Sequence, residues 1–304
     1  MTAVVEPSRS RSARGAWDRY WFEPMPVERV DVFARIIAAT VAFTVLVNDV
    51  WARDHQDAPS EFYRPVQVAR FLHLPAPTPT TMAVLQVVIL ASVVWVMTRR
   101  LPRAAAGVLF GSYLVWLLWA FSWSKVDHDR LTIVVALGVL ALTPRAGPAV
   151  ERMNGWALRV VQVVFVLAYP FSAWAKIRFG GWGWMDSATF ARAIVRRGSS
   201  IGDWLLPYPG LLVLAQWSFI AFEVIAVILL FPSAPRRLRN AALIGVLLLH
   251  VMTFAMIGIS FLPHTICLTA FLPLEHLSRR WRAQRATEVA AAGSGRYGAQ
   301  ASGG

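Results

Sequence analysis

Long apolar runs dominate this sequence and limit what the chain can fold into. They cover the ranges 33–51, 80–98, 104–123, 130–144, 155–176, 209–231, 239–261 and 263–277. A helix needs about 20 apolar residues to cross the roughly 30 Å hydrocarbon core of a bilayer. We therefore predict an all-α, polytopic integral membrane bundle with about eight transmembrane or partly spanning helices. The runs at 130–144 and 263–277 are short, so six full spans plus two partial ones is the alternative count.

Composition favours a membrane protein over a soluble one. Apolar residues make up 57% of the chain, and the mean hydropathy is +0.51. A net charge of +13 would suggest nucleic acid in a soluble protein. Here the basic residues lie between the apolar runs, where positive-inside sorting and anionic headgroups explain them. We expect membrane lipids as partners and no nucleic acid. The single Cys267 excludes a disulfide framework and a thiolate metal cluster.

The charge distribution also predicts an orientation. Counted over alternate connecting segments, basic residues are about twice as numerous on the side that holds both termini, which places both termini in the cytoplasm. Three regions follow: a basic N-terminal tail at 1–32, a transmembrane domain at 33–277, and a disordered basic Gly/Ala-rich tail at 278–304. Two long outer segments, 52–79 and 177–208, suggest an outward-facing functional surface. Within the second, 188–197 is amphipathic and can lie among headgroups or cap the bundle.

A polar stripe runs through the apolar run at 155–176. Gln162, Tyr169 and Lys176 are seven residues apart, which places them on nearly one helix face. A Lys at the bilayer centre costs roughly 2.5 to 3.5 kcal/mol, so it should face protein or water. Lys176 lies near the outer end of its run, however, where a long side chain can also reach the interface.

Other polar residues in the runs have structural as well as functional interpretations. Glu223 shares a helix face with Gln216 and lies too deep to reach water, so it serves a salt bridge or a reaction. His250 lies mid-span, where a neutral imidazole bonded to a carbonyl is the commoner case. Asp127, His128 and Asp129 are consecutive in a connecting segment, which favours a hydrogen-bonding loop over a metal site. We predict no metal.

The stretch around Lys176 resembles a known family. Tyr169 is followed by Ser172, Lys176 and the segment Gly180-Gly181-Trp182-Gly183-Trp184. This order of tyrosine, small residue, lysine and tryptophan–glycine segment resembles HTTM-domain membrane proteins and the transmembrane part of vitamin K-dependent γ-carboxylases. The resemblance covers roughly 33–277 and includes three further sites: His128-Asp129, Glu223 and His250.

The resemblance implies roles for these residues. In the carboxylases the matching Lys acts as a base on vitamin K hydroquinone, which makes Lys176 a candidate catalytic base, with His250 and Glu223 as proton relays. Tyr169 and Ser172 become orienting donors. The further substrate-binding candidates are Gln162, His128 and Trp182. The implied cofactor is a reduced quinone that enters through the bilayer.

Two functional hypotheses follow. The first is an HTTM-class protein of a bacterial cytoplasmic membrane, with an intramembrane site for a quinol-like molecule and a quinol-linked oxidation or carboxylase-like reaction. The second is a non-enzymatic membrane protein that binds or transports a lipid, or assists maturation or export of a peptide partner. Phosphate-binding loops, dinucleotide-binding glycine motifs, H-E-x-x-H and C-x-x-C are absent from the sequence.

Overall fold

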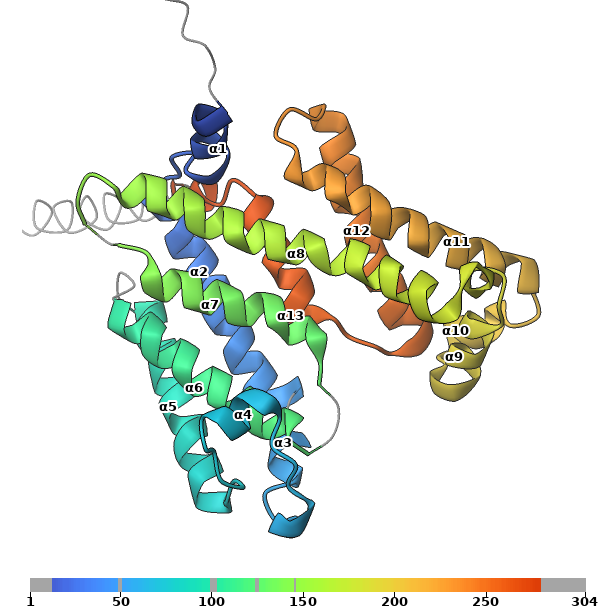
Figure 1. Ribbon diagram of the computed structural model, residues 1–304, viewed down its shortest axis with the longest axis horizontal. Helices are drawn as coiled ribbons and strands as arrows, with labels where there is room; N and C mark the ends of the chain where they lie inside the picture. The colour runs from blue at the N-terminus through green and yellow to red at the C-terminus, as the bar shows by residue number, and fades with distance from the viewer. Residues whose placement is uncertain (1–12, 49–50, 99–102, 124–125, 145, 280–304) are drawn as a thin grey trace, which may run out of the picture.

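The computed structural model describes residues 13–48, 51–98, 103–123, 126–144 and 146–279, and these form helices and turns without a strand (Figure 1). Within these residues, six helices are long and apolar enough to cross a membrane. They are α2 with part of the π-helical η1 (Val27–Val47), α5 (Pro79–Thr98), α6 (Arg103–Phe121), α8 (Val150–Gly180), α11 with η5 (Pro209–Leu230) and α12 (Arg236–Ile257). The prediction of an all-helical membrane bundle is confirmed at this level.

Two of the eight apolar runs form shorter helices. The run at 130–144 gives α7 (Leu131–Leu142), which ends because Thr143 is extended before Pro144. Its 12 residues rise about 18 Å, less than a bilayer core. The run at 263–277 gives α13 (Leu262–Thr265) and the 3-10 helix η6 (Ile266–Phe271). In the described part of the chain, six helices of spanning length and two shorter apolar segments are consistent with the alternative count.

Short helices connect these elements. They are α1 (Ala13–Trp21), α3 (Trp51–Asp54), η2 (Ser60–Phe62), α4 (Gln67–Phe71), η3 (His128–Arg130), η4 (Trp182–Trp184), α9 (Thr189–Arg197) and α10 (Ser200–Leu205). The first long helix begins at Val27, directly after Pro26, and not at residue 33 as we expected. Most of the predicted disordered tail, 280–304, lies outside the described residues.

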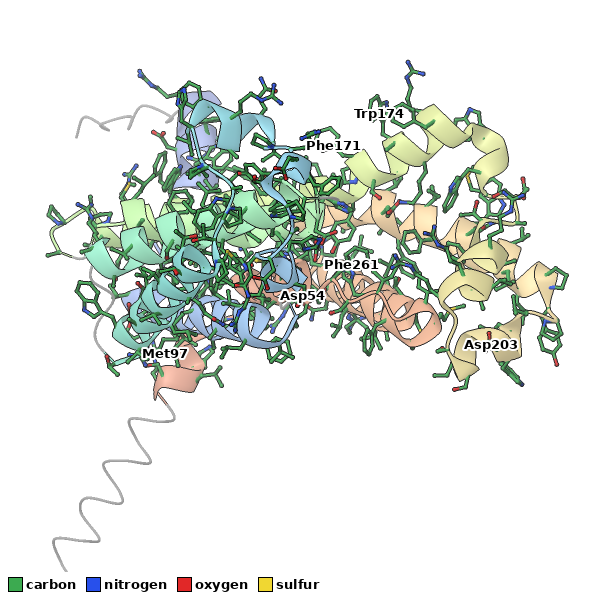
Figure 2. All side chains as sticks on the ribbon, turned by 90° about the horizontal axis from the view of Figure 1, so that it is seen from below. Asp54, Met97, Phe171, Trp174, Asp203 and Phe261 are labelled. Carbon is green, nitrogen blue, oxygen red and sulfur yellow. The ribbon has the colours of Figure 1, made fainter. Side chains whose placement is uncertain are left out.

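α8 is the axis of the molecule. It runs between two groups of helices, with α2, α5, α6 and α7 on one side and α11 and α12 on the other (Figure 1). The core of the first group contains the fully buried rings of Phe33, Tyr113 and Trp116. On the second half of α8, Phe171 and Trp174 are exposed and point away from the other helices (Figure 2). The opposite face of α8, which carries Tyr169, turns inward.

The amphipathic segment predicted at 188–197 forms α9 almost residue for residue. α9 packs against α11 and α12, and its own Ile194 is buried. Ser199 reinforces this end of the bundle, because its hydroxyl donates to the carbonyl of Ala255 on α12 and accepts from the amide of Gly202. Of the two positions left open by the sequence, the structure shows α9 as a cap on the end of these helices.

Candidate functional site

Lys176 pairs with a carboxylate inside the bundle. Its Nζ donates to Glu223 Oε1 at 2.7 Å and to Ser172 Oγ at 2.5 Å, one turn earlier on α8. The Glu223 side chain is 3% exposed and that of Lys176 is 20% exposed. Of the two arrangements that the sequence allowed, an interface lysine and an internal pair, the structure shows the internal pair. We call Lys176, Ser172 and Glu223 the lysine–glutamate cluster.

Aromatic rings cover the lysine–glutamate cluster. Lys176 Nζ lies 5.0 Å from the centre of the Phe219 ring and 5.7 Å from that of Trp184. Both distances are within the range in which a ring face attracts a cation. The Lys176 side chain remains 20% exposed, so the rings cover it in part. Glu223 Oε2 is buried and makes no hydrogen bond of ordinary geometry with the described residues.

Gln216 explains why the segment with Trp184 lies over Lys176. It occupies the same face of α11 as Glu223 and is fully buried. Its Nε2 donates to the carbonyls of Met185 and Ser187 at 2.7 and 2.8 Å, and its Oε1 accepts from the amide of Phe190 at 2.8 Å. Gln216 therefore fixes the exit from α8, and its role is structural.

A second polar group lies two turns earlier on α8. Tyr169 Oη is 2.8 Å from His250 Nε2 on α12 and 3.1 Å from His264 Nε2 on α13. His264 Nδ1 is in turn 2.9 Å from Thr132 Oγ1 on α7. We call these four residues the tyrosine–histidine chain. Each of these four residues is less than a tenth exposed.

The tyrosine–histidine chain has the composition of a proton path. Hydroxyl and imidazole groups both donate and accept, so a change of tautomer at one member can pass along the row. His250 Nδ1, at one end, is buried without a hydrogen-bond partner in the described part of the chain. Since Tyr169 and Lys176 are seven residues apart on one face of α8, the chain and the lysine–glutamate cluster are separated by about 10 Å along the helix.

The remaining sequence-predicted residues lie elsewhere. Gln162 supports the bundle: its Oε1 accepts from Arg159 and its Nε2 donates to the carbonyl of Ala270, each at 2.8 Å. His128 is exposed and contacts Phe261, with ring centres 6.3 Å apart. Trp182 is 72% exposed, and it is Trp184 that covers Lys176. The structure therefore does not bring His128 or Trp182 into either polar group.

Three participants were missed from the sequence. His264 follows Pro263 at the start of an apolar run, and an imidazole in such a run was a usable signal. Thr132 and Phe219 offered no such signal, because threonine and phenylalanine are ordinary residues in an apolar helix.

Among the described residues no group of three His, Cys, Asp or Glu side chains is placed to hold a metal. Asp129 instead pairs with Arg130 at 2.6 Å, and burial raises the pKa of this carboxyl group.

The arrangement as a whole is an ion pair and a hydrogen-bonded row of phenol, imidazole and hydroxyl groups in an apolar bundle. The ammonium of Lys176 and the phenol of Tyr169 lie on one face of α8. They contact the carboxylate of Glu223 on α11 and the imidazole of His250 on α12. Comparison of the chain with protein-family models, with curated proteins and with solved structures finds no match.

Proposed function

We propose that the lysine–glutamate cluster deprotonates an apolar, quinol-like substrate that reaches it through the bilayer. The contact of Lys176 Nζ with the buried Glu223 carboxylate, 2.7 Å long, carries this proposal. A buried base and acid in contact are the usual equipment for proton transfer. The resemblance of residues 169–184 to HTTM-domain proteins and vitamin K-dependent γ-carboxylases supports a hydroquinone as the substrate.

The ion pair must change before Lys176 can act as a base. An ammonium group has no lone pair, so its proton first moves to Glu223, leaving a neutral amine and a carboxylic acid. The amine then takes the hydroxyl proton of the quinol, which gives ammonium and quinolate. Burial favours the first step, because low polarity disfavours separated charges. The tyrosine–histidine chain lies about 10 Å away along α8 and takes no part in these two steps.

The test is quinol turnover by the purified protein in liposomes. We expect wild type to speed the oxidation of a reduced menaquinone analogue by dissolved dioxygen to quinone and hydrogen peroxide, because the quinolate gives up electrons more readily than the quinol. Lys176→Met should lose at least about 100-fold of this rate above the uncatalysed background, the lower range for a general base. Arg178→Gln is the matched control, since it removes a cation two residues away that contacts only the ring of Phe179 among the described residues. Equal rates for wild type and Lys176→Met would remove Lys176 from the mechanism.

The charge bias and the family resemblance also support a bacterial cytoplasmic membrane with both termini inside. Reporter fusions at the two ends test this orientation.

A non-enzymatic role in lipid or peptide handling is the competing proposal. It is supported if the wild-type protein consumes no quinol while it retains its fold.

A further inference from the structure

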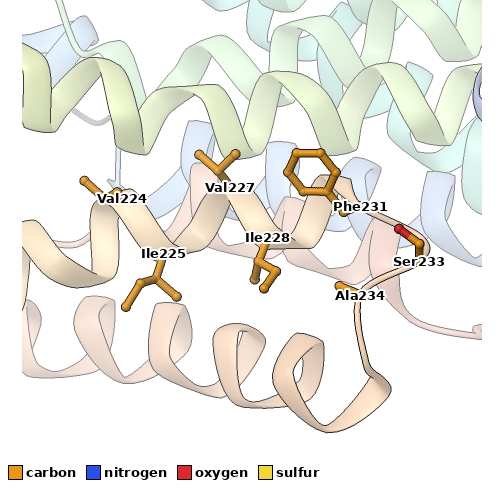
Figure 3. A pocket seen from close by; sticks show the side chains of 7 residues that line it. All are labelled: Val224, Ile225, Val227, Ile228, Phe231, Ser233 and Ala234. Atoms are coloured by element: carbon orange, nitrogen blue, oxygen red, sulfur yellow. The ribbon is translucent and has the colours of Figure 1, made fainter.

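An apolar groove lies where η5 approaches the turn between α11 and α12 (Figure 3). Its volume is about 440 Å³, within the range of small-ligand pockets. It is lined by Val224, Ile225, Val227, Ile228, Phe231, Ser233 and Ala234. Ile225 and Ile228 point toward α12, whereas Val227 and Phe231 point the other way. None of these residues belongs to the lysine–glutamate cluster.

α11 and α12 pack closely at a point just before the groove residues. Gly245 on α12 lies against the ring of Phe222, and a Cβ there would come within 2.8 Å of it. Beyond this contact the chain changes from α11 to the 3-10 turns of η5 and then enters the turn after Phe231. Val224, Ile225 and Phe231 remain 48 to 56% exposed. In a membrane these side chains face lipid.

Uncompensated positive charge lies beside the groove. Arg236, Arg237 and Arg239 lie in the first turn of α12, which has no acidic residue. Only Pro235 separates them from the groove residues Ser233 and Ala234. None of the three guanidinium groups makes a hydrogen bond or an ion pair with the described residues. Their position is electrostatically unfavourable, because the amino end of a helix is already positive. Arg239 is also near enough to Arg159 on α8 to repel it.

We propose that this groove binds one anionic phospholipid, with an acyl chain against Ile225 and Ile228 and the phosphate on Arg236 and Arg237. An acyl chain fits the apolar lining, and guanidinium groups bind phosphate oxygens in pairs. The net charge of the headgroup decides which lipid binds. A zwitterionic headgroup brings a cation next to three arginine side chains that have no counter-ion, whereas an anionic headgroup brings only negative charge. The site is separate from the proposed quinol chemistry and does not depend on it.

Native mass spectrometry of the full-length protein in detergent tests the proposal. We expect tighter binding of phosphatidylglycerol than of phosphatidylcholine with the same chains. Arg236→Gln/Arg237→Gln should weaken phosphatidylglycerol binding about 25-fold, because each basic residue near an anionic surface contributes roughly fivefold. Ile228→Trp fills the groove and should weaken both lipids.

A matched control is available at the other end of α12. Arg196 and Arg197 are a second exposed pair, in the last turn of α9, and Arg196→Gln/Arg197→Gln should leave lipid binding unchanged. Equal affinity of the wild type for the two lipids would overturn the proposal, as would an equal loss in this control. Displacement of phosphatidylglycerol by equimolar inorganic phosphate would show a free-anion site and would also overturn it. The arginine variants alter only solvent-facing side chains, so they remain informative if Ile228→Trp does not fold.

Discussion

Lys176 and Glu223 form a pair whose two members depend on each other. Removing two charges from water costs about as much as their attraction returns, so a buried ion pair adds little net stability. Removing one member is different, since the other is left as an uncompensated charge. Glu223 is the more buried partner, at 3% exposure, and therefore the one that suffers most from loss of its counter-ion.

We therefore expect Lys176→Met to lower the free energy of unfolding by about 3 kcal/mol. Lys176→Met/Glu223→Gln should recover most of this loss, because the uncompensated carboxylate is gone. Thermal unfolding in detergent measures both variants and the single Glu223→Gln variant. Ser218→Ala serves as the control, because it removes an exposed hydroxyl from α11, the helix that carries Glu223. If the losses of the two single variants simply add in the double variant, the side chains are not coupled.

Tyr169 is the central member of the tyrosine–histidine chain. Its hydroxyl lies between two imidazole nitrogens, so Tyr169→Phe leaves both without that partner. Buried polar groups that lose a partner cost about 1 to 3 kcal/mol, and we expect a loss of stability in this range. Tyr208→Phe, at an exposed ring before α11, should have no measurable effect in the same unfolding assay. Equal behaviour of the two variants would mean that the hydrogen bonds of Tyr169 contribute nothing to stability.

Spacing along the sequence was sufficient to group residues on a face but not to choose their partners. The seven-residue spacing of Tyr169 and Lys176 and of Gln216 and Glu223 predicted two polar faces. That Lys176 meets Glu223 and Tyr169 meets His250 depends on how α11 and α12 cross α8, which no local pattern encodes. Gln216 shows the limit, because it shares a face with Glu223 yet serves the loop before α9.

At the scale of elements, apolar length predicted the long helices. α8 is the informative case, since it extends beyond its apolar run at both ends and begins at Val150. The added amino-terminal turns pack against the chain after α1, where Gly155 touches the backbone of Glu23. This contact was not predictable, because a helical glycine in an apolar run carries no sign of what approaches it.

Gly155→Ala tests the contact between α8 and the segment before α2. A Cβ at this position would lie 1.8 Å from the carbonyl oxygen of Glu23, so the backbone must move. We expect a loss of about 1 to 3 kcal/mol, typical of overpacking, and faster proteolysis near Arg19. Gly111→Ala is the control, because nothing lies within 4 Å of the added carbon and alanine favours helix by about 1 kcal/mol. A stable Gly155→Ala variant would show that the segment is not held against α8.

At the scale of the whole molecule, polar contacts join its two ends. Arg29, near the start of α2, donates to both carboxylate oxygens of Glu275 at 2.7 and 2.6 Å across 246 residues of sequence. Gln162 in the middle of the chain also holds the carboxyl-terminal part, by donating to the carbonyl of Ala270. The sequence did not predict these contacts, since Arg29 had been assigned to a tail that precedes the bundle. In the structure it lies in the first turn of α2.

The contact between Arg29 and Glu275 predicts a loss of stability in acid. Hydrogen bonds from Arg29 lower the pKa of Glu275 to about 2, below its ordinary value, so the carboxylate stabilises the fold above about pH 4.5 and loses this effect as the pH falls toward 2. Glu275→Gln should be less stable than wild type at pH 7, and the difference should shrink by more than half at pH 3. Thermal unfolding across this range measures it. Glu151→Gln, an exposed acid at the start of α8, should track wild type throughout. A difference between wild type and Glu275→Gln that stays constant down to pH 3 would contradict a role for this ion pair in joining the two ends.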